Sequence, residues 1–148
     1  MPSSSILRLR SGQVFRISVK AMERVIFNNN IEKIRNFRNL IIWKSGIEIV
    51  RDIYLAIKSF SKEELYCLTS QMRRCAISIP SNIAEGFSRK HNKEYKQFLY
   101  IALSSCSELE TQVEISYMLE YIQKTRRDDF INKINHTSCM INNLIKCL

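Results

Sequence analysis

Cysteine and histidine are the residue types in this chain that could bind a metal ion or supply a nucleophile. The five cysteines are Cys67, Cys75, Cys106, Cys139 and Cys147. No two of them have the CxxC spacing of zinc and redox sites, and the two histidines, His91 and His136, are far apart in the sequence. We therefore predict no metal site, no cofactor and no catalytic cysteine, and we expect buried free thiols in a reducing cytoplasm.

Basic side chains are the other group that could do chemistry, by binding phosphate. Lysine and arginine outnumber aspartate and glutamate by 23 to 14, which gives a formal net charge of +9. This excess favours nucleic acid or another polyanion as a partner, although it also keeps a protein soluble. No apolar run approaches the ~18 residues of a membrane span, so we predict no membrane contact.

Long helices are the elements that must position these side chains. The chain has only 3 glycines and 2 prolines in 148 residues, fewer than sheets and loop-rich folds need. Residues 1–33 are basic and lack helical periodicity, although the alternation around Ser11 and Gly12 allows a hairpin. We predict a loosely attached N-terminal extension over residues 1–33 and one helical domain over residues 34–148.

The first predicted helix begins near Phe37 and carries two apolar stripes. The first stripe has the 3,4 spacing of a core seam and consists of Leu40, Trp43, Ile47, Val50, Tyr54 and Ile57. The second stripe consists of Ile42, Ile49 and Ile53 and lies about 100° away around the helix. It indicates either a subunit interface or a helix buried deeply in its own bundle.

The second predicted helix begins at Ser61, which forms a capping box with Glu64, and continues across Pro80. Its apolar spacing runs through the proline without a change of phase, in Leu65, Leu68, Met72, Cys75, Ile79 and Ile83. We therefore predict one helix that is kinked at Pro80 and ends near Gly86, with this glycine as the C-terminal stop. Asn82, or a group from a neighbouring subunit, is expected to satisfy the carbonyl that Pro80 leaves without a donor.

Two further helices complete the predicted fold. The third begins at Ser88 or Asn92 and has its core seam in Tyr95, Phe98 or Leu99, Ala102, Cys106, Leu109, Val113 and Ser116. The fourth begins near Asp128 and Asp129, and its seam is Phe130, Ile134, Ser138, Ile141, Leu144 and Leu148. Four helices with short connections predict an all-α, antiparallel, up-down-up-down four-helix bundle.

Three segments carry a family resemblance that covers about residues 36–123. They are FRNLIIWKSGIEIVRDIY, LTSQMRRCAISIPSNIAEGFSRK and FLYIALSSCSELETQVEIS, in this order. The chain resembles the four-helix bundle proteins encoded by intervening sequences of bacterial 23S rRNA genes. This resemblance implies a cytoplasmic homopentamer without enzymatic activity. It also implies kinship to the accessory variability proteins of diversity-generating retroelements, which bind nucleic acid and a reverse transcriptase.

Arg73 and Arg74 lie beside the core seam of the second helix. Antiparallel pairing with the third helix places them within a turn of Glu108 and Glu110, so ion pairs between helices or subunits are the structural interpretation. Phosphate binding is the functional one. Glu85 lacks the partner that acid or base catalysis would need, and Lys93 is its expected salt-bridge partner.

The strongest candidate for a binding surface follows from the topology. In an up-down bundle, the turn between helices two and three lies at the same end as the start of helix one and the end of helix four. The basic N-terminal extension is expected to converge there as well. The bundle residues that converge there, which we call the basic pole, are Arg38, Arg89, Lys90, Lys93, Lys96 and Lys146. The alternative interpretation is a solvated charged end without function.

Two functions are therefore compatible with the sequence. The first is a non-enzymatic oligomer that binds nucleic acid, with RNA favoured, through a basic face. The second is a scaffold that docks a protein partner such as a reverse transcriptase, without contacting nucleic acid itself. No phosphate-binding loop, metal spacing or acid/base pair supports an enzyme.

Overall fold

The computed structural model describes residues 5–8, 14–17 and 35–148 of the chain. The first two segments are short strands, β1 (Ser5–Arg8) and β2 (Val14–Ile17), which pair antiparallel with Ser5 opposite Ile17. The prediction of an all-α chain therefore holds for residues 35–148 alone. The rest of the extension lies outside the described residues, and its loose attachment stays a prediction.

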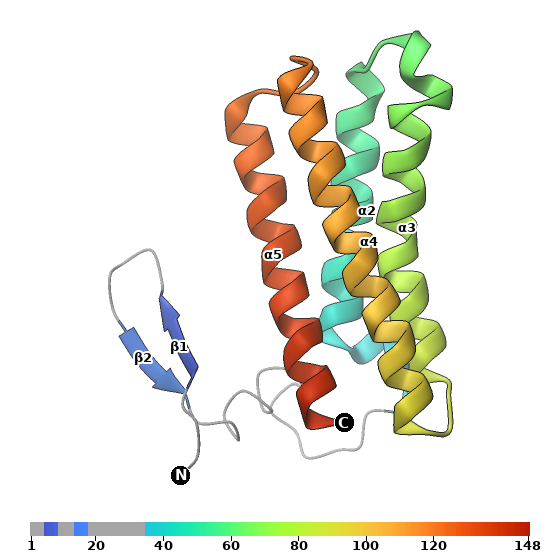
Figure 1. The fold of residues 1–148 in the computed structure, drawn as a ribbon, viewed down its shortest axis with the longest axis vertical. Coiled ribbons are helices and arrows are strands. Elements are labelled where there is room, and N and C mark those ends of the chain that lie inside the picture. Colours follow the sequence, from blue (N-terminus) through green and yellow to red (C-terminus); the bar gives the residue numbers. More distant parts are fainter. Residues whose placement is uncertain (1–4, 9–13, 18–34) are drawn as a thin grey trace.

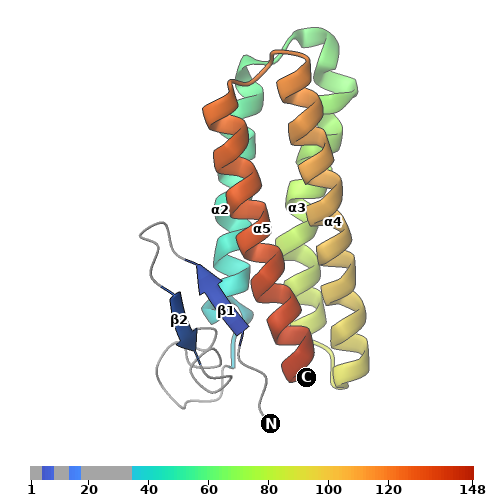
Figure 2. The same cartoon turned by 60° about the vertical axis from the view of Figure 1, so that its left-hand side comes forward.

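Helices account for most of residues 35–148, and the prediction of four long ones is confirmed there. The α-helices are α2 (Ile41–Ala56), α3 (Leu68–Phe87), α4 (Asn92–Met118) and α5 (Lys124–Cys147). Short 3-10 helices stand at η1 (Phe37–Asn39), η2 (Ile57–Ser59) and η3 (Lys62–Tyr66). Figure 1 shows the four α-helices side by side, with successive helices joined at alternating ends, and Figure 2 shows the same arrangement from another side. Among the described residues, no helix combines the length and apolarity needed to cross a membrane.

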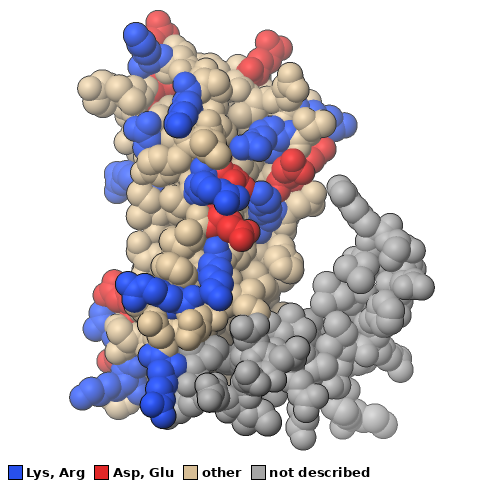
Figure 3. Space-filling view, turned by 180° about the vertical axis from the view of Figure 1, so that it is seen from behind, with Lys and Arg blue, Asp and Glu red and all other residues tan. Residues whose placement is uncertain are grey.

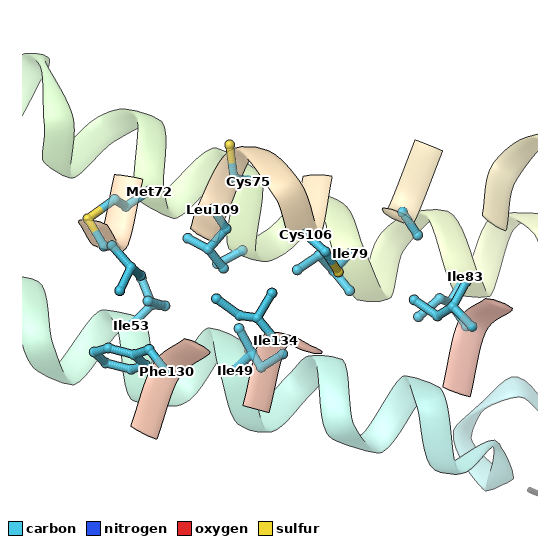
Figure 4. Packing of buried hydrophobic residues seen from close by; sticks show 14 of the residues in the cluster. Ile49, Ile53, Met72, Cys75, Ile79, Ile83, Cys106, Leu109, Phe130 and Ile134 are labelled. Carbon is cyan, nitrogen blue, oxygen red and sulfur yellow. The ribbon is translucent and has the colours of Figure 1, made fainter. Parts of the chain in front are cut away.

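All four helices contribute to one apolar core, which Figure 4 shows from close by. The second stripe of α2 belongs to this core, because Ile42, Ile49 and Ile53 are at most 1% exposed. In contrast, Ile47 and Tyr54 of the expected seam are 42% and 38% exposed. The structure thus decides the alternative that the sequence left open: Ile42, Ile49 and Ile53 are buried within the protomer and cannot contact a second subunit.

The helix α3 continues through Pro80, as the unbroken apolar spacing predicts. Pro80 is buried against α2, and a Cβ added at Gly46 would lie 3.2 Å from the Pro80 Cβ. Asn82 does not donate a hydrogen bond to the carbonyl of Ala76, which lies four residues before the proline. Its Nδ2 donates instead to the carbonyl and the hydroxyl of Ser78, at 2.8 and 2.9 Å. The prediction for Asn82 is therefore wrong, whereas a donor from a neighbouring subunit and the kink at Pro80 stay predictions.

The predicted end of α3 near Gly86 is confirmed, but Gly86 does not act as the predicted glycine stop. The helix continues to Phe87, and Ser88 follows with helical backbone angles. A Cβ at Gly86 would lie 2.7 Å from Cδ2 of Tyr95 and 2.8 Å from Cβ of Phe98. The glycine is therefore needed for the close approach of α4 to α3, and not for a left-handed turn.

The ends of the helices differ in detail from the expected caps. Ser61 accepts a hydrogen bond from the Glu63 N–H at 3.3 Å and begins the 3-10 helix η3, whereas Glu64 Oε2 accepts from the Leu68 N–H at 3.3 Å and caps α3. The predicted capping box is thus divided between two helices. At the end of α4, Glu120 adopts the left-handed conformation, with φ of 60°, that glycine usually supplies.

Candidate nucleic-acid interface

Three chain segments meet at one end of the bundle. They are η1 with the first turn of α2, the turn between α3 and α4, and the last turn of α5, all at the lower end in Figure 1. Asn92 Nδ2, in the first turn of α4, donates to the carbonyl of Leu148 at 2.9 Å and ties α4 to the end of α5. Packing of η1 against α3, together with this hydrogen bond, brings the three segments together, so residues far apart in the sequence share one surface.

The side chains of the basic pole are mostly exposed on this surface. Lys96 is half-buried, whereas the exposed members are Arg38, Arg89, Lys90, Lys93 and Lys146. Figure 3 shows lysine and arginine predominating at the lower end, while basic and acidic side chains are interleaved further up. Arg89 is the one member that forms an ion pair within residues 35–148. The carboxylates of Glu85 and Glu94 lie among these six cations, so the pole carries a net positive charge.

Arg38 is held by its neighbours in η1. Asn36 begins this helix, and its Oδ1 accepts a hydrogen bond from the Arg38 N–H at 3.0 Å. The Arg38 guanidinium lies over the ring of Phe37, with its carbon 4.8 Å from the ring centroid. Phe37 in turn packs edge to face on Trp43, with the ring centroids 5.4 Å apart. The Arg38 guanidinium thus packs on a pair of aromatic rings that itself packs against the core of the bundle.

Arg89 is held by two contacts in the turn between α3 and α4. Its Nη2 donates to Glu85 Oε1 at 2.5 Å, and its guanidinium carbon lies 4.7 Å from the ring centroid of Phe98. Because Glu85 pairs with Arg89, four residues along the same chain, its predicted pairing with Lys93 is wrong. Lys93 and Lys90 are left without a carboxylate partner among the described residues.

Arg73 and Arg74 lie outside the basic pole. Sixteen residues separate Arg73 from Arg89 along the same helical stretch, which corresponds to ~24 Å. Arg73 faces α2, where its guanidinium carbon lies 5.6 Å from the ring centroid of Tyr54 and its Nε is buried without a hydrogen-bond partner in the structure. The predicted ion pairs of these arginines with Glu108 and Glu110 are absent from the described part of the chain, whereas pairing between subunits stays a prediction.

A polar hollow of about 220 Å³ opens between α3 and α4. It is lined by Gln71, Arg74, Cys75, Ser78, Ser105 and Glu108. Glu108 accepts a hydrogen bond from Gln112 Nε2 at 3.4 Å and does not pair with Arg74. Burial, together with the hydrogen bond to Glu108, raises the pKa of the Cys75 thiol to about 11. Cys75 is therefore a protonated thiol at neutral pH. Cys75 and Cys106 are buried, as predicted, whereas Cys67, Cys139 and Cys147 are exposed, so the prediction of buried thiols is wrong for these three.

Two further cations flank this end and were missed in the sequence. Arg35 precedes η1, and Lys44 lies in the first turn of α2 beside Trp43; both are exposed. In the sequence, the signal that could have identified these two cations is their position next to the apolar residues that begin the bundle. They extend the positive surface from η1 onto α2.

Comparison with known proteins places this architecture in a family. A family model described as 23S rRNA-intervening sequence protein matches residues 38–143. The chain belongs to this family. The matched region includes α2, α3, α4 and most of α5. The resemblance in the three sequence segments is thereby confirmed.

A solved structure has the same fold. It is a protein of unknown function from the S23 ribosomal protein family of Bacteroides thetaiotaomicron VPI-5482. The two structures superpose with a TM-score of 0.65 at 22% sequence identity, over 72% of this chain and 99% of the other. The search among curated proteins finds no match. At this identity the likeness concerns the fold alone.

Proposed function

We propose that this chain is a cytoplasmic, non-enzymatic, oligomeric protein that binds nucleic acid, and RNA in preference to DNA, through the basic pole. The observation that supports the proposal is that six cationic side chains from three segments lie at one end of the bundle. Among the described residues, one of the six, Arg89, pairs with a carboxylate. Phosphate groups interact favourably with such a surface without regard to base sequence. The family's description in terms of 23S rRNA favours RNA.

Salt dependence is the first prediction from this proposal. If the five cations without a carboxylate each neutralise one phosphate, the affinity for single-stranded RNA falls on the order of 100-fold between about 50 and 200 mM salt. Fluorescence anisotropy with a labelled RNA measures this slope directly. An affinity that does not change over this range, or the absence of any binding at low salt, contradicts the proposal.

A double charge-reversal variant tests whether the basic pole is the RNA-binding site. Lys90→Glu with Lys93→Glu is expected to weaken RNA binding at least tenfold, because two phosphate contacts become repulsive. Lys124→Glu with Arg126→Glu changes the net charge equally at the exposed start of α5, at the opposite end of the bundle. An equal loss in both double variants would assign the binding to net charge and not to the basic pole.

Oligomerisation is proposed from exposed apolar side chains on two sides of the bundle. On α2 and α3 these are Ile47, Tyr54 and Ile77, between 38% and 43% exposed, and on α4 they include Ile101 at 47%. Two different apolar faces on one protomer fit a head-to-tail contact, which closes into a ring when repeated by rotation. We propose a homopentamer, which copies the basic pole around the ring axis.

The oligomer prediction uses an apolar contact that does not belong to the core. Ile77→Asp is expected to reduce the molar mass in light scattering to that of the protomer, because a carboxylate would be buried in the contact. Asn142→Asp adds the same charge at an exposed position of α5 and should leave the mass unchanged. A monomeric unaltered chain, or an assembled Ile77→Asp variant, would contradict the proposed interface.

A scaffold that docks a protein partner is the second candidate, and the end opposite the basic pole favours it. There Tyr66 and Met118 are 87% and 77% exposed, and Leu65 and Leu119 are also exposed. The hydrogen bond from Tyr121 to Glu64, at 3.2 Å, holds η3 against the turn between α4 and α5 and so brings these side chains to one end. A partner such as a reverse transcriptase would bind this end, and a purified protein that retains no RNA would support this candidate.

A further inference from the structure

The basic pole contains two arginines that lie over aromatic rings. The Arg38 guanidinium carbon is 4.8 Å from the centroid of the Phe37 ring, and the Arg89 guanidinium carbon is 4.7 Å from that of Phe98. Both arginines are exposed to solvent, and the Arg89 side chain is 41% exposed. Each planar cation is therefore covered on one side by a ring and accessible on another.

This arrangement has a consequence for the kind of nucleic acid that can bind. A guanidinium plane can stack on the face of a nucleobase, whereas the compact ammonium group of lysine cannot. Because the rings, and for Arg89 also Glu85, already restrict these side chains, less conformational freedom is lost when a base stacks on them. Unpaired nucleotides expose their base faces, whereas the bases of a duplex are covered by their neighbours.

We infer that the basic pole recognises single-stranded RNA, with unpaired bases stacked on Arg38 and Arg89 and phosphates bound by Lys90 and Lys93. This inference rests on the proposed function and adds its substrate class. Stacking is tolerant of base identity, so little sequence preference is expected. Trp43, the single tryptophan of the chain, packs on Phe37 and lies next to the inferred stacking position.

The opposite end of the bundle offers an internal control. Arg126 lies over the ring of Phe130 at 4.9 Å, a geometry like that of Arg38 and Arg89, and is also exposed. It belongs to the first turn of α5, away from the basic pole. Replacement of Arg126 by lysine therefore measures the general effect of removing an arginine from a ring.

The experiment compares one RNA strand, alone and annealed to its complement, by fluorescence anisotropy against the full chain. The unaltered chain is expected to bind the single strand more tightly than the duplex. The double variant Arg38→Lys, Arg89→Lys keeps the net charge, and it should lose about tenfold in affinity for the single strand and little for the duplex. Arg126→Lys should change neither affinity, and circular dichroism checks that all variants are folded.

Trp43 emission provides a second readout. The single strand should change the emission of Trp43 in the unaltered chain, and this change should be lost in the Arg38→Lys, Arg89→Lys variant. Equal affinity for both forms, or an equal loss for both forms in the double variant, overturns the stacking inference and leaves RNA binding by the pole intact. The absence of binding to either form overturns the proposed function as well.

Discussion

Gly86→Ala is expected to destabilise the fold by about 2–3 kcal/mol, although alanine is the better helix former by about 1 kcal/mol. The added Cβ would lie 2.7 Å from the Tyr95 ring and 2.8 Å from the Phe98 Cβ. The Phe98 Cβ is bonded directly to the backbone of α4, so rotation of the side chain cannot move it away. Relief requires α4 to shift from α3, which also disturbs the ring beneath Arg89.

Gly46→Ala is the matched control for this prediction. Its Cβ would lie 3.2 Å from the Pro80 ring, so a shift of that ring by a few tenths of an ångström is sufficient to relieve the contact. The gain in helix propensity offsets this cost, and we expect a change within about 1 kcal/mol. Urea unfolding followed by circular dichroism measures both variants. A Gly86→Ala variant that is as stable as Gly46→Ala would show that α3 and α4 do not need the close approach.

The buried carboxylate of Asp52 is the basis of the second large effect. Asp52 is 6% exposed, accepts two hydrogen bonds from Arg51 at 3.2 Å and pairs with Lys133 of α5. Asp52→Asn keeps the size of the side chain and removes the charge that both cations face. We expect a loss of about 1–2 kcal/mol at neutral pH, below the value for a fully buried pair because both cations reach solvent.

The pH dependence of this loss follows from the pKa of Asp52. Burial by itself would raise the pKa of this carboxyl, but the hydrogen bonds and charges of Lys133 and Arg51 lower it below the ordinary 3.8. A lowered pKa in the folded state gives stability that is present above 3.8 and is lost as the pH falls through the folded value. The difference between Asp52→Asn and the unaltered chain should therefore close in acid.

Glu48→Gln, one turn earlier on the exposed side of α2, is the control for this titration. It removes one carboxylate charge in the same way, and its effect is expected to stay within about 0.5 kcal/mol at every pH. Unfolding free energies of the three proteins from neutral to acid pH give the comparison. A constant gap between Asp52→Asn and the unaltered chain would show that the charge of Asp52 is not what stabilises the contact.

Local spacing predicted most elements of this fold. The core residues of α4 were predicted correctly from Leu99 to Ser116, because a single apolar stripe has one way to face a bundle. The continuity of α3 across Pro80 was visible for the same reason. On α2 two stripes competed, and periodicity alone could not rank them, since burial depends on where the other three helices lie.

The residues of the candidate site also differ in whether the sequence alone could predict them. Convergence at the basic pole follows from chain topology, so Arg89 and Lys90 were predictable once four helices were recognised. The aromatic supports of Arg38 and Arg89 were not, because they depend on side-chain directions between neighbouring elements. The pairings expected for Glu85 and Glu108 were wrong because register estimates place helices to within about a turn, whereas an ion pair needs contact.

The amino-acid sequence by itself determined the number of helices, their approximate ends and the family to which the chain belongs. These properties depend on periodicity and on residues that are neighbours along the chain. The tertiary structure decided which stripe of α2 is buried, why Gly86 must be a glycine, and which arginines lie over rings at the basic pole. These properties depend on distances between helices, which close packing of side chains sets and no single helix encodes.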